Sequence, residues 1–202
     1  MNTPTLPDTP AQRKPAAGRA EQHSTRLLFL LAGFSAAAWA SLVPVAKAAT
    51  GVNEGQLGLV LLCLGIGSLL AMPVSGVVST RHGCRKVLMV CGVALCACLP
   101  LLASVQNVFT LAAALFFFGA MIGTFDCVMN IQAVIVERDS KRPLMSGFHG
   151  FYSLGGLLGA ATTSTIMDLG VSPFATVSAI ALAGVLLLMG IRRHVLPYGN
   201  PA

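Results

Sequence analysis

Charged residues are scarce in this chain of 202 residues. Only 10% are Asp, Glu, Lys or Arg and 55% are hydrophobic, whereas ordinary soluble domains carry roughly 25% charged residues. The hydrophobic residues fall in long runs, and about twenty such residues are what an α-helix needs to cross a bilayer. The composition therefore excludes an ordinary soluble domain and predicts an all-α integral membrane protein.

Motifs for enzymatic chemistry are also missing. The sequence contains no phosphate-binding loop, metal-ligand cluster or cofactor motif, so we expect no cofactor and no metal. Intramembrane serine proteases need a Gly-x-Ser-Gly nucleophile, but Ser153 has its nearest glycines at Gly150 and Gly155. We predict that the protein is not an enzyme. The six cysteines lie in or beside apolar runs and are predicted to be small core residues.

Six apolar runs are long enough to span a membrane. They cover residues 27–46, 56–79, 87–105, 108–136, 144–167 and 173–191. We therefore predict a disordered cytoplasmic tail (1–25), a six-helix transmembrane domain (26–195) and a short C-terminal tail (196–202). A signal peptide ending near Ala48 is the alternative for the first run, which is nevertheless long enough to span.

The positions of the basic residues predict the orientation. Four Lys and Arg lie before the first apolar run, three in each of the second and fourth loops and two at the C-terminal end, whereas only Lys47 lies in the other loops. Since cytoplasmic loops are rich in these residues, both termini are predicted to be cytoplasmic. The basic residues form no continuous face, so the net charge of +6 does not indicate a nucleic-acid partner.

Small residues are concentrated in the second and fifth spans. They allow helix backbones to approach closely, so these two spans are predicted to face a partner helix. The third and sixth spans carry the least polar residues and are predicted to face lipid. Because this order repeats after three helices, we predict two inverted three-helix repeats. The glycines concerned are Gly58, Gly65, Gly67 and Gly76 in the second span, and Gly155, Gly156 and Gly159 in the fifth.

The loop after the second span carries the most specific local pattern. Gly83 permits a tight turn between two packed helices, and a basic cluster surrounds it. The loop resembles the signature loop of the major facilitator superfamily, which implies a gating role for Gly76, Arg81, Gly83, Arg85 and Lys86. Thr80 stands where that family usually has Asp, which removes a carboxylate associated with the cytoplasmic gate.

Further segments extend the resemblance over about residues 27–195. They are 39–44, Gly51, 56–58, 126–132, 136–137, 142–149 and 153–156. Together they resemble a branch of bacterial permeases close to the fucose permeases, although Leu42 stands where that branch often has Arg. The resemblance implies the amino-terminal six-helix half of a major facilitator permease in the bacterial inner membrane.

Asp126 is an ionisable residue inside an apolar run. Such a group costs at least ~2.5 kcal/mol near the bilayer centre, so it is a functional-site hypothesis by default. It lies about 15 Å from the cytoplasmic end of its span, and Asn130 follows one turn later on the same face. The resemblance implies that Asp126 is the protonatable group and that Asn130 binds the solute. The alternative is that Asp126 bonds to a neighbouring helix.

Two more residues are candidates for the same site. His149, near the start of the fifth span, could relay protons to Asp126 or be a structural hydrogen-bonding group. Trp39 could stack against a sugar-like solute or pack in the core.

The predicted function is proton-linked movement of a small polar solute, such as a sugar, across the bilayer. A six-helix half would need a second half or a second copy, because alternating access moves one half against the other. The alternative is a truncated fragment that transports nothing without such a partner.

Overall fold

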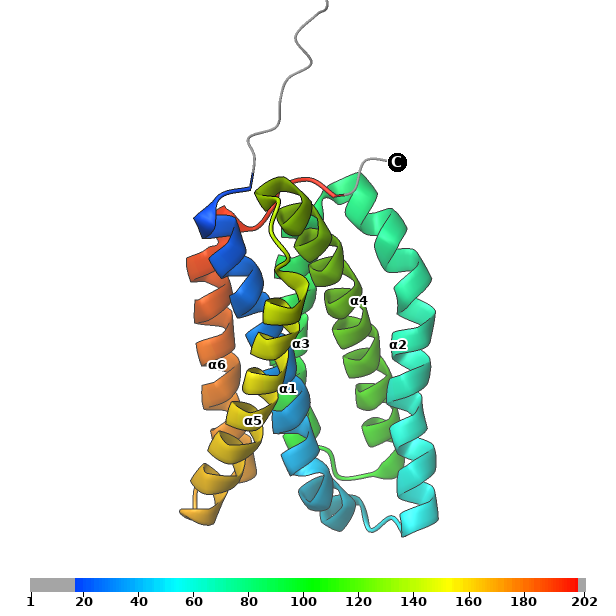
Figure 1. Cartoon of the computed structure of the whole chain (residues 1–202). Helices are drawn as coiled ribbons and strands as arrows, with labels where there is room; N and C mark the ends of the chain where they lie inside the picture. Colours follow the sequence, from blue (N-terminus) through cyan, green and yellow to red (C-terminus); the bar gives the residue numbers. More distant parts are fainter. Residues whose placement is uncertain (1–16, 200–202) are drawn as a thin grey trace, which may run out of the picture.

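A computed structural model describes residues 17–199. In this part of the chain, six α-helices form one bundle, and the start of α1 and the end of the described chain lie at the same end of it (Figure 1). The elements are α1 (Arg19–Thr50), α2 (Glu54–His82), α3 (Cys84–Ala103), α4 (Val108–Ser140), α5 (Met145–Asp168), α6 (Pro173–Ile191) and the 3-10 turn η1 (Arg192–His194). The predicted all-α architecture is confirmed.

Five of the helices in the described part are long and apolar enough to cross a membrane. They are α1, α2, α3, α4 and α6, the last taken together with η1. The protein is therefore a multi-pass membrane protein. α5 has a suitable length of 24 residues, but Gly, Ser and Thr are distributed along it. A membrane crossing by α5 remains a prediction.

Side chains before three helices fix where the helices begin. Asn53 caps α2 by accepting from the Gln56 N–H at 2.9 Å, and Asn107 caps α4 by accepting from the Thr110 N–H at 2.9 Å. Ser172 caps α6. Each cap satisfies a backbone donor that has no partner inside its helix.

α1 and α5 approach each other through glycines. A Cβ added at Gly33 would overlap the carbonyl of Tyr152, and a Cβ added at Gly155 would overlap the carbonyl of Leu30. The two backbones are thus in direct contact, as expected of glycine-mediated helix packing in a membrane.

α2 and α4 approach each other in the same way. A Cβ added at Gly67 would overlap the carbonyl of Phe116, and one added at Gly119 would overlap the carbonyl of Leu64. Both helix pairs follow the same rule. Each glycine contacts the carbonyl of a residue on the other helix, and that residue lies three positions before the glycine of the other helix. Exchanging α1 with α4 and α2 with α5 converts one pair into the other, which is the relation that the predicted three-helix repeats require. The inverted repeat itself remains a prediction.

The glycine-rich faces are thus partly occupied within the chain. Gly155 and Gly159 of α5, which were predicted to face a partner helix, pack on α1, and Gly67 of α2 packs on α4. Gly58, Gly65 and Gly76 of α2 have no atom within 4 Å of an added Cβ. α2 is also the least buried of the five apolar helices, so the face that carries these three glycines is open.

The N-terminal boundary differs from the prediction. α1 begins at Arg19, so the predicted disorder is wrong for residues 19–25; residues 1–16 lie outside the described residues. The reason is tertiary, because Ser24 and Thr25 are buried and the Ser24 hydroxyl donates to the carbonyl of His194 at 2.8 Å. No apolar periodicity signals such contacts.

Residues 195–199, which we name the docked segment, lie against the α2–α3 turn. The N–H of Arg85 donates to the Leu196 carbonyl at 2.8 Å, and the Cys84 N–H to that of Tyr198 at 3.3 Å. Burial and the nearby acidic side chains of Asp139 and Glu21, with Cys84, raise the pKa of the Tyr198 hydroxyl. The predicted C-terminal tail is therefore packed onto the bundle as far as residue 199.

Candidate functional site

Asp126 lies near the middle of α4. It is half-buried, whereas its neighbours Phe125, Val128 and Met129 are fully buried in the core. Fourteen residues separate it from Ser140 at the end of α4, which is about 21 Å of helix. Among residues 17–199, the carboxylate of Asp126 has no ion pair within 4.0 Å.

Asn130 shares the face of Asp126, as predicted. Its side-chain amide donates to the backbone carbonyl of Asp126 at 2.9 Å. The bond orients the Asn130 side chain along α4 and leaves its amide oxygen available as an acceptor. Asn130 is half-buried like Asp126, so the two residues form a polar stripe on one side of an otherwise apolar helix.

The structure brings His149 of α5 into electrostatic range of Asp126. The imidazole is exposed on one side, and its ring stands edge-on to Phe29 of α1, with 5.2 Å between ring centroids. The two side chains lie on different helices and form no ion pair within 4.0 Å in the described part of the chain, so the relay hypothesis remains a prediction.

Tyr152 is a further member of the site that the sequence interpretation missed. It lies on α5, is half-buried and interacts electrostatically with Asp126. The signal that could have found it is its spacing, because residues three apart share a helix face and Tyr152 follows His149 by three. The site thus combines a carboxyl group, an imidazole and a phenol from two helices.

Trp39 does not join this group. It is 5% exposed and packs with Leu42 and Phe118 in a core cluster separate from the one that contains Met129, with 6.4 Å between the Trp39 and Phe118 rings. Of the two alternatives for Trp39, the geometry supports packing. Leu42 fills the same cluster with apolar volume, where an Arg would bring a buried charge.

The α2–α3 turn has the geometry predicted for Gly83. Its φ is 81°, and a Cβ there would overlap the carbonyl of Pro197 in the docked segment. Arg85 donates from Nε to the Val195 carbonyl at 2.7 Å and from Nη2 to the Arg193 carbonyl at 3.0 Å. The turn is therefore a docking point for the C-terminal end of the described chain.

The other residues of this loop have fewer contacts. Gly76 lies within α2 with open space at its Cβ position, and Arg81 and Lys86 are exposed. Thr80, in the place of the family's Asp, donates to the Gly76 carbonyl of its own helix at 2.9 Å. In the described part of the chain it therefore forms no charge interaction with the loop.

A second missed residue is Gln132 of α4, which is fully buried. Its amide nitrogen donates to the Thr25 hydroxyl at 3.0 Å, and its oxygen accepts from the N–H of Leu196 at 3.2 Å. Gln132 thus connects α1 and α4 to the docked segment. Its sequence signal was weak, because a polar residue six positions after Asp126 lies on another face of the helix.

A comparison with known protein families identifies the family of this chain. A sequence profile of the Major Facilitator Superfamily matches residues 27–201. The chain belongs to the Major Facilitator Superfamily. The predicted membership of this superfamily of membrane transporters is therefore confirmed.

Named relatives agree with this membership. The chain is 49% identical over 179 residues to an "Uncharacterized MFS-type transporter" of Yersinia pestis, covering 89% of this chain and 47% of the relative. It is 34% identical over 160 residues to an "Uncharacterized transporter" of Sinorhizobium fredii, covering 78% of this chain and 42% of the relative. "Membrane protein MosC" of Rhizobium meliloti is 31% identical, with 79% and 39% covered. The chain spans about half the length of the curated relatives it matches.

Within this major facilitator chain, the arrangement around Asp126 is suited to moving protons. A carboxyl group, an imidazole and a phenol can all give and accept protons, and the Asn130 amide can bind a polar solute. The described residues contain no group of three His, Cys, Asp or Glu that could hold a metal ion.

Proposed function

We propose that this chain forms one half of a major facilitator transporter that moves a small polar solute together with protons. The observation that carries the proposal is the carboxylate of Asp126, which is half-buried in the middle of a membrane-spanning helix, has no ion pair among the described residues and interacts electrostatically with His149 and Tyr152. A charge in this position is costly unless it has a role or a partner.

In this proposal Asp126 takes up a proton on one side of the membrane and releases it on the other. His149, which is exposed, relays protons between Asp126 and the aqueous phase at the start of α5. The free amide oxygen of Asn130 accepts a hydrogen bond from a solute hydroxyl. A sugar or a similar metabolite fits these groups, and the chain would lie in the bacterial inner membrane with both termini cytoplasmic.

The transport cavity needs a second half, which a separate chain or a second copy would supply. The open face of α2, with Gly58, Gly65 and Gly76, supports a helix partner there. Cysteines introduced at Gly58 and Gly65 are expected to crosslink between two chains. If neither position crosslinks, association of two copies through α2 is wrong.

The test of the function is solute uptake by proteoliposomes with an imposed pH gradient, using a panel of radiolabelled sugars. Asp126→Asn is expected to abolish uptake driven by the gradient, because the amide cannot carry a proton. Asp168→Asn, which neutralises an exposed carboxylate at the end of α5, is the matched control and should transport normally. Equal gradient-driven uptake by Asp126→Asn and the parent chain would contradict the role of Asp126. No uptake by the parent would instead favour a fragment that needs a second half.

A further inference from the structure

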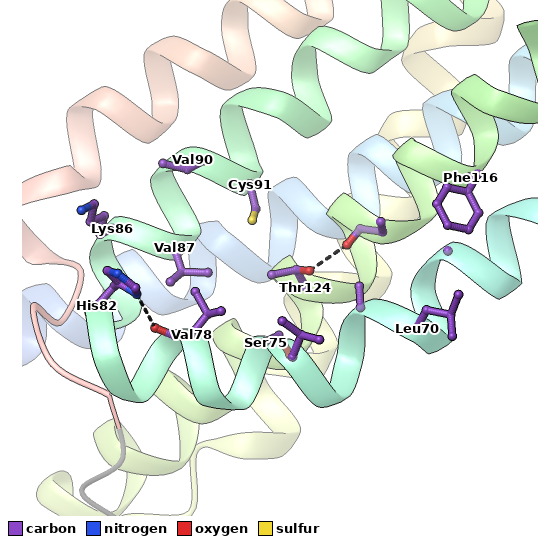
Figure 2. A pocket seen from close by; sticks show the side chains of 14 residues that line it. Leu70, Ser75, Val78, His82, Lys86, Val87, Val90, Cys91, Phe116 and Thr124 are labelled. Atoms are coloured by element: carbon purple, nitrogen blue, oxygen red, sulfur yellow. Dashed lines mark hydrogen bonds between the residues drawn. The ribbon is translucent and has the colours of Figure 1, made fainter.

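An apolar cavity of about 520 Å³ lies between α2 and α3, with α4 as its floor (Figure 2). Its size falls within the ~300–1,000 Å³ typical of ligand sites. The lining residues that carry the argument are Leu70, Val74, Ser75, Val90, Phe116 and Thr124.

The two hydroxyl groups inside this cavity already have hydrogen-bond acceptors. The Ser75 hydroxyl donates to the Met72 carbonyl at 2.6 Å, and the Thr124 hydroxyl to the Ala120 carbonyl at 2.8 Å. Leu70, Val74 and Val90 are each more than half exposed along its walls. Between these hydroxyl groups the cavity therefore offers mainly apolar surface, which favours a hydrocarbon chain.

One end of the cavity is basic. Figure 2 shows His82 and Lys86 at that end and Leu70 and Phe116 at the other. A second cavity of about 360 Å³ adjoins it, shares His82 and Lys86, and adds the side chains of Arg85 and Arg192. No carboxylate lines either cavity.

These cations are not neutralised within the described chain. Neither Lys86 nor Arg192 forms an ion pair among residues 17–199, and Arg85 donates only to backbone carbonyls. The shared end thus has a positive charge without a protein counter-ion, next to a dry apolar groove. An anion with a hydrocarbon tail would complement both parts.

The groove also has the length of a lipid chain. Fifteen residues of α2 separate Gly67 from His82 along the lining, which is about 22 Å of helix. One leaflet of the hydrocarbon core is about 15 Å thick. A lipid with its headgroup at His82 would therefore fit an acyl chain within the groove.

We propose that this groove binds an anionic phospholipid. One acyl chain occupies the apolar cavity, and the headgroup phosphate lies against Lys86, Arg85 and Arg192 in the adjoining basic cavity. Basic pockets between transmembrane helices are suited to anionic headgroups. Asp126, His149 and Tyr152 do not line this lipid site. The proposal of lipid binding is therefore independent of the proposal that the chain transports a solute.

The test uses the full chain in detergent micelles that contain equal amounts of phosphatidylglycerol and phosphatidylcholine, with retained lipids counted by native mass spectrometry. The parent is expected to retain phosphatidylglycerol preferentially. Lys86→Gln with Arg192→Gln should weaken this retention about fivefold for each cation removed and leave phosphatidylcholine unaffected. Arg81→Gln is the control, because Arg81 is equally basic, exposed and outside both cavities.

A second pair of variants tests the groove. Val74→Trp fills it and should lower retention of both lipids severalfold, whereas Val77→Trp, on the same helix and comparably exposed but outside the lining, should not. These exposed sites tolerate large side chains, and the size-exclusion profile verifies folding. The proposal is overturned if the parent shows no preference, if the double charge variant keeps that preference, or if Val74→Trp retains both lipids like the parent.

Discussion

Gln132 is a single residue that connects three separate parts of the chain. It donates to Thr25 of α1 and accepts from the N–H of Leu196 in the docked segment, and it is fully buried. Thr25 has a second bond, from its hydroxyl to the Glu21 carbonyl at 2.7 Å. Within residues 17–199, in contrast, the N–H of Leu196 has Gln132 as its only acceptor. The connection therefore depends most on the Gln132 oxygen.

Gln132→Leu is expected to destabilise the protein by about 1–3 kcal/mol, because the buried Leu196 N–H loses its acceptor. Thermal unfolding in detergent would measure the loss. Gln106→Leu, at an exposed position in the α3–α4 loop, makes the same chemical change and should leave the unfolding temperature unaffected. Unchanged stability of Gln132→Leu would show that the docked segment adds little to the fold.

The polar residues differ in how far the sequence could predict them. Asp126 and Asn130 stand out because an ionisable group in an apolar run is rare, and their spacing of four places them on one face. The partners of Gln132 lie 107 and 64 residues away in the sequence, and no local pattern encodes such contacts. Trp39 was open to two interpretations because an indole suits both a cavity wall and a core.

At the scale of helices, close backbone contact determines which elements pair. Gly67 of α2 and Gly155 of α5 each touch a carbonyl of the neighbouring helix, whereas Gly65 and Gly58 of α2 touch nothing. Glycine is unfavourable in a helix interior, so the contacts at Gly67 and Gly155 explain why it is present there.

Gly67→Ala is expected to lower stability by about 1–3 kcal/mol, since the added methyl overlaps the Phe116 carbonyl and forces α2 and α4 apart. Gly65→Ala, two residues away on the same helix, meets open space and should be neutral or slightly stabilising through its better helix propensity. Parallel thermal unfolding of the two variants would separate these effects. If both lose equal stability, the backbone contact at Gly67 is not what joins the helices.

The helices themselves were largely predictable. Long apolar runs locate helices well, because every backbone group in a membrane must be satisfied within its own segment. The early start of α1 was missed because residues 19–25 are ordered by contacts with α4 and the C-terminal end. The assignment of glycines to partners was also beyond the sequence, because an internal and an external partner require the same small residues.

For the whole molecule, the topology depends on α5, the helix whose apolar character is weakest. Its ends are Met145 and Asp168, and the carboxylate of Glu137 in α4 accepts from the N–H groups of Leu144 and Met145 at 2.6 and 2.7 Å. α5 thus starts from the same end as the last turn of α4, and its length is sufficient for a crossing.

If α5 crosses the membrane, its two ends are reached from opposite sides. In a cysteine-free background, Arg142→Cys and Leu169→Cys should react with an impermeant maleimide from different faces of the membrane. Both positions are exposed. Gln106→Cys is the reference and should react from the same face as Leu169→Cys. Labelling of positions 142 and 169 from one face would leave five crossings and place the two termini on opposite sides.

The glycine contacts described above also have a mechanical consequence. α1 with α5, and α2 with α4, are joined backbone to backbone, so neither pair can slide without steric overlap. α4 and α5 make few direct contacts with each other, and they carry Asp126 on one side and His149 and Tyr152 on the other. Each stiff pair therefore holds one part of the site. A change in the angle between the two helix pairs would therefore change the distance between the Asp126 carboxylate and the His149 imidazole. A measurement of that distance would report how the two pairs move relative to each other.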